Sequence, residues 1–330
     1  MRVLLTGAAG FIGRVVHASL EAYGDEVVAY DRALRPSDDI TDLVPVRAAI
    51  ADCDAVVHLA AKVGLGIGIG DIDDYALHND LGTAVVLRAT AEAGVTRLVF
   101  ASSMVVYGEG AYACRRHGPV RPTARRREDL ARGDFEVHCP RCDEALQPLL
   151  VSEDAPLDPR NTYAATKVHG EHLAAGWARE TGGVVAALRF HNVYGPGLPR
   201  DTPYAGVAAL FADRLAAGEA TRVFEDGRQR RDFVHVEDVA RAVTAAVRVP
   251  LPDGVTPLNI GSGQVSTVGQ VAAALTEAVG GLAPVTTGEF RLGDVRHVTA
   301  DSAAARRVLG WEAEITLAEG VRDLLPPATR

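Results

Sequence analysis

The sequence predicts an α/β protein with a doubly wound parallel sheet and a smaller C-terminal lobe. Short apolar or β-branched runs at residues 2–6, 26–30, 54–59, 97–102 and 183–190 alternate with helical patterns at 11–22, 74–93 and 161–181. This alternation is typical of parallel strands that are joined by covering helices. Gly94 and Gly182 follow two of these helical patterns, at the position where glycine commonly ends a helix.

The later part of the chain is less regular. No convincing strand is found between Asp31 and Asp52, and after residue 197 the expected helices lie at 204–217, 236–247 and 267–279. We expect residues 1–190 to form the domain that holds the sheet, with an insertion at 108–150. Residues 191–330 would form mainly the smaller lobe, with a segment at about 232–262 returning to the first domain.

Composition and charge exclude several classes of function. The chain has 330 residues, of which 48% are hydrophobic, and a formal net charge of -9. An acidic protein has no general affinity for nucleic acid or for an anionic membrane. No apolar run approaches the roughly 20 residues that cross a bilayer, and the first strand leaves no room for a secretory leader. We therefore expect a cytoplasmic protein with no nucleic-acid or membrane partner.

Three glycines follow the first expected strand and open the first expected helix. Gly7, Gly10 and Gly13 have the spacing that lets a backbone turn approach a pyrophosphate, with Phe11 and Ile12 at the start of the helix. The N–H groups at a helix N-terminus favour bound phosphate. The motif predicts a Rossmann-type dinucleotide site, and the alternative is a glycine-rich turn of structural use only.

Asp31 indicates which dinucleotide is bound. It ends the second expected strand, where a carboxylate accepts hydrogen bonds from the adenosine ribose and repels a 2′-phosphate. This position favours NAD over NADP. Arg32 and Arg35 lie beside it and are able to accommodate a phosphate, so NADP is the alternative.

Ser103, Tyr163 and Lys167 are the candidate catalytic residues. In a helix that begins near residue 161, Tyr163 and Lys167 lie one turn apart on one face. Because the pKa of a free tyrosine is near 10, positive charge on Lys167 and on a nicotinamide ring would favour the phenolate that accepts an alcohol proton. Ser103 would hydrogen-bond the same substrate oxygen. Alternatively, Tyr163 packs in the core and Lys167 is a solvated helix residue.

These motifs resemble the extended short-chain dehydrogenase/reductases, specifically the NAD-dependent sugar-nucleotide epimerase/dehydratase family. The resemblance covers nearly the whole chain. Its segments are TGAAGFIG at 6–13, DITD at 39–42, HLAA at 58–61, FASSMVVYG at 100–108, YAATK at 163–167, RFHNVYGPG at 189–197, RDFVHVEDVA at 231–240 and RLGDVRH at 291–297.

The resemblance implies roles for further residues. One group would contact the cofactor: Asp39 and Ile40 at the adenine, then Leu59, Ala60, Ala61 and Asn79, with Lys167 at the nicotinamide ribose. A second group would hold a nucleotide-diphosphate sugar: Asn192, Arg231 and Arg291 at the diphosphate, and Asp294 at the nucleotide or ribose. The planar guanidinium of arginine suits phosphate oxygens. The alternative for each arginine is a surface ion pair.

One departure from the family pattern reduces the number of candidate reactions. Dehydratases and decarboxylases of this kind usually carry an acid shortly after the catalytic Ser or Thr, whereas Met104 and Val105 stand there and cannot transfer a proton. The pattern therefore favours a 4-epimerase. Tyr163 would accept the O4 proton while hydride leaves C4, and the 4-ketose would turn over and take the hydride back. The implied substrate is a dTDP-sugar such as dTDP-L-rhamnose, or a UDP-hexose.

Two other functions stay open. An NAD(P)-dependent reductase of NDP-4-ketosugars would consume external reduced cofactor, whereas an epimerase would not. A non-catalytic NAD-sensing or scaffold protein has no need of a tuned phenolate, so Ser103, Tyr163 and Lys167 weigh against it. The resemblance also implies a homodimer that forms through the helices at 74–93 and 161–181.

The insertion carries a pattern of metal ligands. The segment between residues 107 and 163 has 55 residues, about twice what the resemblance implies. Cys114 and His117, with Cys139 and Cys142, supply four donors, as in a closed tetrahedral zinc site. We expect a structural zinc that stabilises a polar loop and takes no part in catalysis. Unpaired cysteines beside a loop histidine, or a redox pair, are the alternatives.

Arginine is frequent in the same insertion. Six arginines lie between residues 114 and 127 with no acidic residue among them, and Glu128, Asp129, Asp134 and Glu136 follow closely. A solvated surface is the simpler interpretation. The alternative is a zinc-pinned flap that overhangs the sugar pocket or a partner subunit and narrows the choice of substrate.

Overall fold

Six parallel strands form the central sheet of the computed structural model, which describes residues 1–64, 69–200 and 206–324. The strand order is β12-β8-β4-β3-β1-β2, and every neighbouring pair is parallel. The members are β1 (Arg2–Thr6), β2 (Glu26–Tyr30), β3 (Ala55–His58), β4 (Arg97–Ser103), β8 (Val184–Phe190) and β12 (Gly254–Ile260). The predicted α/β fold with a doubly wound parallel sheet is confirmed.

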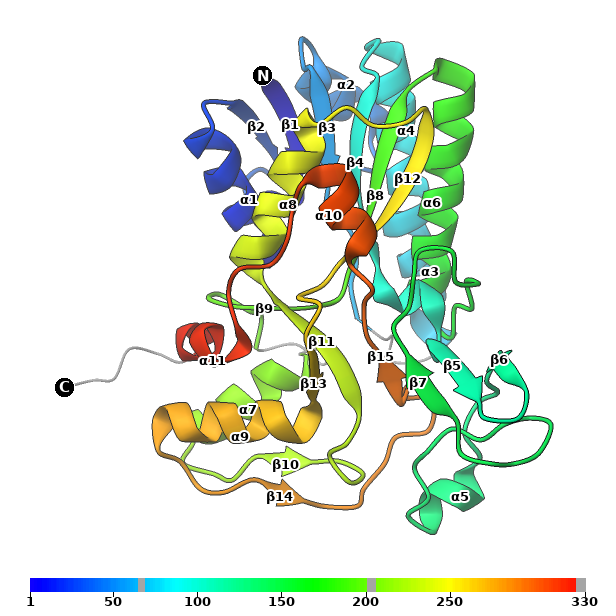
Figure 1. The fold of residues 1–330 in the computed structure, drawn as a ribbon. Coiled ribbons are helices and arrows are strands. Elements are labelled where there is room, and N and C mark those ends of the chain that lie inside the picture. Colours follow the sequence, from blue (N-terminus) through cyan, green and yellow to red (C-terminus); the bar gives the residue numbers. More distant parts are fainter. Residues whose placement is uncertain (65–68, 201–205, 325–330) are drawn as a thin grey trace.

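Helices cover both faces of this sheet (Figure 1). One layer contains α1 (Phe11–Ala22), α8 (Val236–Arg248) and α10 (Ala303–Leu309); the other contains α2 (Leu43–Ile50), α4 (Gly82–Glu92) and α6 (Thr162–Thr181). Val3 and Leu5 pack into the first layer and Leu4 into the second, because successive strand residues face opposite sides. In the described part of the chain, no helix has the length and apolar character that a bilayer crossing requires.

Three elements differ from the sequence-based expectation. The helix expected at 74–93 consists of α3 (Ile72–Tyr75), the π-helical segment η2 (Ala76–Leu81) and α4. Helix α2 was not expected, because Pro45 suggested a break. Proline is tolerated in a first helical turn, and Asp42 caps this one by accepting from Val44 N at 3.0 Å. The helix expected at 204–217 is α7 (Val207–Ala216), and residues 204 and 205 lie outside the described residues.

The C-terminal lobe has a small core of its own. Helices α7 and α9 (Val268–Val279) pack with α11 (Leu317–Gly320) and η4 (Val321–Leu324) around Tyr194 and Phe211. Its strands are β9 (Asn192–Tyr194), β10 (Arg222–Val223), β11 (Arg230–His235), β13 (Val265–Thr267), β14 (Val285–Thr286) and β15 (His297–Val298). Between β11 and β13 the chain passes through α8 and β12 of the first domain, so the two parts are joined at several places.

The insertion is a small folded unit. Strands β5 (Ala111–Cys114), β6 (Gly118–Val120) and β7 (Gln147–Leu149) form an antiparallel sheet, and α5 (Arg127–Ala131) lies between β6 and β7 in the chain. Tyr112, Val137 and Leu146 form its core together with the cysteines. It lies at the lower right of Figure 1, beside β15 of the C-terminal lobe. The sequence suggested only a loop here, because its apolar runs are very short.

A buried ion pair connects helix α6 to the sheet. Arg189 on β8 donates from Nε and Nη2 to the Glu171 carboxylate of α6, at 2.9 and 2.7 Å. Ser102 of β4 donates to the same carboxylate at 2.5 Å. Arg189 Nη1 donates to Tyr107 Oη at 2.8 Å, and Tyr107 in turn donates to Asn259 Oδ1 of β12 at 2.7 Å. This network joins three strands and α6 below the carboxyl edge of the sheet.

Neutralising Glu171 should destabilise the fold strongly. Glu171→Gln would leave the buried Arg189 without its counter-ion, which costs about 3–5 kcal/mol in comparable cases. We expect this loss in the free energy of unfolding measured with urea. Glu180→Gln on the exposed face of the same helix is the control and should stay within about 0.5 kcal/mol of the wild type. A loss below about 1 kcal/mol for Glu171→Gln would contradict this role.

Candidate active site

The glycine turn after β1 is packed too closely to accept side chains. Gly7 has φ +73°, and a Cβ there would lie 2.7 Å from Ala60 N. A Cβ on Gly13 would lie only 2.0 Å from the Gly7 carbonyl oxygen. Gly10 immediately precedes Phe11, the first residue of α1. The turn therefore brings bare backbone and the N-terminus of a helix to the carboxyl edge of the sheet, where doubly wound proteins bind ligands.

The Asp31 carboxylate lies at the end of β2, next to this turn. Its Oδ2 accepts from Ala9 N at 3.0 Å, and its Oδ1 accepts from Ala33 N at 2.8 Å. One carboxylate therefore holds the glycine turn and the residues that follow β2. Each oxygen keeps a further lone pair, which is the acceptor capacity that a ribose hydroxyl requires.

The two arginines near Asp31 are both ion-paired. Arg32 Nη1 lies 3.4 Å from Asp39 Oδ2, and Arg35 Nε donates to Asp38 Oδ2 at 2.9 Å. Asp39 is held in place as well, since it accepts from Thr41 N and Oγ1, and these bonds lower its pKa against the effect of burial. Because each guanidinium has a carboxylate partner, this region offers a 2′-phosphate little net positive charge.

A cavity of about 680 Å³ runs along the carboxyl edge of the sheet. It brings together most residues expected at the cofactor, namely Gly7, Gly10, Phe11, Ile12, Gly13, Asp31, Ile40, Leu59, Ala60 and Ala61, with Tyr163 and Lys167. Among the described residues, Asp39 and Ser103 are not part of its wall, although their neighbours Asp38 and Ser102 are. The cavity therefore joins the glycine turn to the candidate catalytic residues.

Asn79 lies behind the wall of this cavity, on η2. Its Nδ2 donates to Thr166 Oγ1 at 3.0 Å and to the Lys62 carbonyl at 2.9 Å. Its Oδ1 accepts from Lys62 N at 2.7 Å. Lys62 lines the cavity and Thr166 lies on α6, so Asn79 fixes the wall relative to the helix that carries Tyr163.

Strand β4 and helix α6 bring the three candidate catalytic residues together. Ser103 is the last residue of β4, and its hydroxyl lies near enough to the Tyr163 phenol to lower its pKa. Lys167 lies one turn after Tyr163, with its Nζ 5.7 Å from the centre of the Tyr163 ring. That amine also donates to the Ala101 carbonyl at 2.8 Å. The arrangement places a hydroxyl and a cation around one phenol, as proton transfer to and from an alcohol requires.

Burial dominates the acid–base properties of this group. It raises the pKa of Tyr163 to about 12, although the nearby Ser103 hydroxyl acts in the opposite direction. It lowers the pKa of Lys167 to about 8, although Glu171 one turn later raises it. The chain's own groups therefore favour the neutral phenol of Tyr163. A positively charged nicotinamide ring beside it would favour the phenolate.

Arg231 of β11 presents a guanidinium without a counter-ion. Its Nη1 donates to the carbonyls of Arg230 and Arg296, both at 2.9 Å, and its Nη2 donates to the Val295 carbonyl at 2.7 Å. Burial lowers its pKa, although the charge of Asp294 raises it. Within the described part of the chain, no carboxylate forms an ion pair with Arg231. An anionic ligand would compensate this charge.

The other residues expected to bind the substrate lie in the same lobe, Arg291 and Asn192 at its diphosphate and Asp294 at its nucleotide or ribose. Arg291 is exposed, with its guanidinium carbon 5.3 Å from the centre of the Phe224 ring. Burial raises the pKa of Asp294, although Arg291 and Arg231 lower it. Asn192 lies on β9, which pairs with β11, and among the described residues its buried Oδ1 has no hydrogen-bond partner. Asn192 and Arg231 therefore lie on neighbouring strands and retain capacity for a polar ligand.

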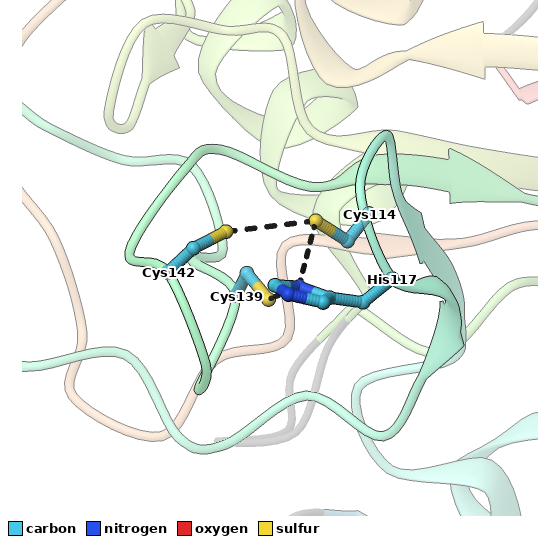
Figure 2. A group of neighbouring side chains, drawn as sticks. All are labelled: Cys114, His117, Cys139 and Cys142. Carbon is cyan, nitrogen blue, oxygen red and sulfur yellow. Dashed lines mark hydrogen bonds between the residues drawn. The ribbon is translucent and has the colours of Figure 1, made fainter.

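The four candidate metal ligands converge within the insertion (Figure 2). Their ligand atoms all lie within 4.8 Å of one another. His117 Nδ1 is 3.4 Å from the sulfur atoms of Cys114 and Cys139, and the sulfur atoms of Cys114 and Cys142 are 3.7 Å apart. Burial raises the pKa of Cys139, but backbone N–H groups and the neighbouring ligands lower it to about 6. All four cysteines of the chain are free thiols.

Most of the six arginines at the start of the insertion are ion-paired. Their carboxylate partners are Glu144 for Arg116, Asp158 for Arg121, Glu225 for Arg125, and Asp129 for Arg126. Three of these four side chains are largely exposed, as a solvated surface requires. Arg125 differs, because only 3% of its side chain is exposed.

Sequence reasoning missed the residues that support the site from below. Glu171 follows Lys167 by one helical turn and lies close enough to raise its pKa, and Arg189 holds Glu171 in place. Lys62 forms an ion pair with Asp74 at the cavity wall. The four-residue spacing of Lys167 and Glu171 was a usable signal, because such residues share a helix face.

Comparison with known sequences gives a consistent assignment. A profile of the NAD dependent epimerase/dehydratase family matches residues 3–126 and 140–261. The unmatched residues between these ranges lie within the insertion, around α5 and the segment that leads to Cys139. The matched ranges include the glycine turn, β4, α6 and β11, and thus every element that carries a candidate catalytic residue.

Curated relatives and solved structures are similar over almost their whole length. The chain is 31% identical to a dTDP-L-rhamnose 4-epimerase of Burkholderia thailandensis, covering 98% of this chain and 93% of the relative. It is 33% identical to a UDP-glucose 4-epimerase of Mycolicibacterium smegmatis, covering 97% and 96%. A structure of MoeE5 in complex with UDP-glucuronic acid and NAD has 33% identity and a TM-score of 0.77, covering 98% and 97%. This chain belongs to the NAD-dependent epimerase/dehydratase family.

Proposed function

We propose that this protein is an NAD-dependent nucleotide-sugar 4-epimerase. The observation that carries the proposal is that one cavity is lined both by the glycine turn and by Tyr163 and Lys167, with Ser103 near the Tyr163 phenol. The similarity to 4-epimerases of dTDP-L-rhamnose and UDP-glucose supports it. A dTDP-sugar such as dTDP-L-rhamnose, or a UDP-hexose, is the proposed substrate.

The proposed mechanism follows from the side chains around Tyr163. Tyr163 accepts the proton of the sugar O4 and later returns it, while the Ser103 hydroxyl orients that oxygen. Lys167 keeps the site positive and orders the nicotinamide ribose. When bound, NAD supplies the hydride acceptor and returns the same hydride, so that no net oxidation results. The sugar turns over as a 4-ketose while its diphosphate is held.

We assign the two parts of the chain different tasks in this reaction. Residues 1–190 bind the cofactor, and residues 191–330 bind mainly the substrate, with about 232–262 returning to the first domain. Asp31 would accept from the adenosine ribose. Arg231, Arg291 and Asn192 would hold the diphosphate. This assignment is supported by the Arg231 guanidinium, which forms no ion pair with a carboxylate of the described residues.

Purified protein should interconvert C4 epimers without added NADH. Incubation with UDP-glucose or dTDP-L-rhamnose, followed by NMR at C4, should show a mixture of epimers. Tyr163→Phe should lower kcat by about 10²–10⁴-fold, because it removes proton transfer while preserving shape. Tyr23→Phe on the exposed end of α1 is the control. Full turnover by Tyr163→Phe would disprove the catalytic role, and conversion only of a 4-ketosugar with NADH or NADPH would identify a reductase.

We further propose that Cys114, His117, Cys139 and Cys142 hold a structural zinc. Zinc bonds of about 2.3 Å to sulfur and 2.0 Å to nitrogen give a tetrahedron with edges of about 3.8 Å between sulfurs and about 3.5 Å between sulfur and nitrogen. The observed separations of 3.7 and 3.4 Å agree with these edges. A location in the cytoplasm, which stays a prediction, would keep the thiols reduced. None of the four ligands lines the cofactor cavity.

Metal analysis should find about one zinc per chain. Cys139→Ala should reduce this well below one and lower the melting temperature, because the metal joins segments that share only a small core. Cys53→Ala, which changes the one cysteine outside the insertion, should retain the metal. Wild-type protein that is purified without a chelator and contains no zinc would disprove the site.

A homodimer through α4 and α6 is the proposed assembly. These helices pack against each other along one side of the molecule (Figure 1). Leu77 and Leu81 on the adjoining η2 are 44% and 48% exposed, and they share a face because they lie four residues apart. A second copy of the chain would cover these apolar side chains.

Light scattering should give about twice the chain mass of 34.8 kDa. Leu81→Arg should shift the protein towards the monomer, because it places a charge in the proposed interface. Leu282→Arg, at an exposed leucine of the C-terminal lobe, should leave the dimer intact. A wild-type mass of one chain would exclude the assembly.

A further inference from the structure

The insertion is joined to the C-terminal lobe by a chain of alternating charges. Arg125 Nη2 donates to Glu225 Oε1 at 2.8 Å, and Glu225 Oε2 accepts from Arg296 Nη1 at 2.8 Å. Arg296 Nη2 then donates to Glu136 Oε1 at 2.7 Å. Arg125 and Glu136 come from the insertion, whereas Glu225 and Arg296 come from the lobe. The side chains of Arg125, Glu225 and Arg296 are at most 3% exposed.

Arg125 also holds the backbone of the segment that carries Asp294. The same Nη2 atom donates to the Asp294 carbonyl at 2.7 Å. Arg231 donates to the next two carbonyls, those of Val295 and Arg296. Three consecutive carbonyls are therefore fixed by two guanidinium groups, one from the insertion and one from β11.

The Glu136 side chain fixes the other end of the same segment. Its Oε1 accepts from Arg296, and its Oε2 lies 3.0 Å from His297 Nε2. His297 is the first residue of β15, and its Nδ1 accepts from Arg230 N on β11 at 3.0 Å. The insertion thus contacts the segment at Asp294, Arg296 and His297.

These contacts join the insertion to the lobe and also fix the orientation of the 294–296 segment relative to the insertion. Burying several charges is costly, and a packed apolar contact of similar size would join the two parts with less loss. The planar fork of arginine, in contrast, accepts partners only in fixed directions. Arg125 donates to Glu225, to the Asp294 carbonyl and to the Phe135 carbonyl at 3.0 Å, so small shifts of the segment would break several bonds.

We propose that Arg125 is a positioning residue for the nucleotide diphosphate of the substrate. It acts through the 294–296 segment, which it aligns with Arg231 so that Arg291, Asp294 and Arg231 meet the ligand in one arrangement. This inference rests on the proposed function, because it assigns these residues to substrate binding. The insertion is then a clasp on the diphosphate site, formed by Arg125 and Glu136.

Arg125→Ala should weaken substrate binding and leave chemistry intact. We expect the KM for UDP-glucose or dTDP-L-rhamnose, and the Kd for UDP or dTDP by calorimetry, to rise about tenfold or more with kcat within about twofold. For Arg125→Lys, KM and Kd should lie between those of the wild type and those of Arg125→Ala. The lysine amine restores the positive charge beside Glu225 but cannot make the several directed bonds of a guanidinium. NAD affinity and zinc content should not change.

Arg132→Ala is the matched control. It removes an arginine of the same insertion whose side chain is 70% exposed and, among the residues the structure describes, pairs with Asp129 inside the insertion alone, so KM and Kd should stay at wild-type values. If Arg125→Ala loses stability but keeps its KM and Kd, or loses kcat alone, the proposal is overturned. Should Arg125→Ala fail to fold, Glu136→Gln is measured in the same way and must raise Kd.

The proposed function and the clasp fail in different ways. If the wild-type protein binds UDP or dTDP but epimerises none of the sugars, the 4-epimerase proposal is overturned. The Kd values of the variants for UDP or dTDP then test the positioning role of Arg125 by themselves. Wild-type turnover with an unchanged KM in Arg125→Ala overturns the clasp alone. Wild-type protein that binds neither nucleotide overturns both.

Discussion

The buried ion pair between Arg189 and Glu171 is the constraint on which the active site depends. Helix α6 carries Tyr163 and Lys167, and this pair fixes that helix against β8 and β4. Arg189 also reaches Tyr107 and the Glu153 carbonyl, so the segments before and after the insertion are tied to the same guanidinium. Removing such charges from water is expensive, and the cost is offset only because nearly every donor and acceptor of the pair is satisfied.

A second buried network joins the insertion to the C-terminal lobe. Glu225 and Arg296 form its centre, and the insertion contributes a residue at each end. The two networks differ in what they hold. The first fixes the helix that carries Tyr163 and Lys167 against the sheet, whereas the second fixes main-chain carbonyls of the lobe. The insertion is therefore attached to the lobe through buried charges, although its cysteines lie in a separate small core.

The sequence predicts most of what depends on local pattern. Strand runs that are apolar on both faces indicate a parallel sheet, and the glycines at 7, 10 and 13 together with the four-residue spacing of Tyr163 and Lys167 indicate the site. It does not predict the partners of Arg125 or Arg296, because tertiary folding joins residues far apart in the chain. The π-helical turn at η2 was missed for a similar reason, since packing decides it.

The position of Asp31 ties cofactor choice to the shape of the glycine turn. One oxygen accepts from Ala9 N inside the turn, and the other accepts from Ala33 N after β2. If Asp31 binds the adenosine ribose as proposed, a substitution there that admits a 2′-phosphate would also remove a support of the glycine turn. Adaptation to NADP would then pass through a protein that binds both NAD and NADP weakly, unless a second substitution restores the glycine turn first. Such coupling makes cofactor preference resistant to gradual evolutionary drift.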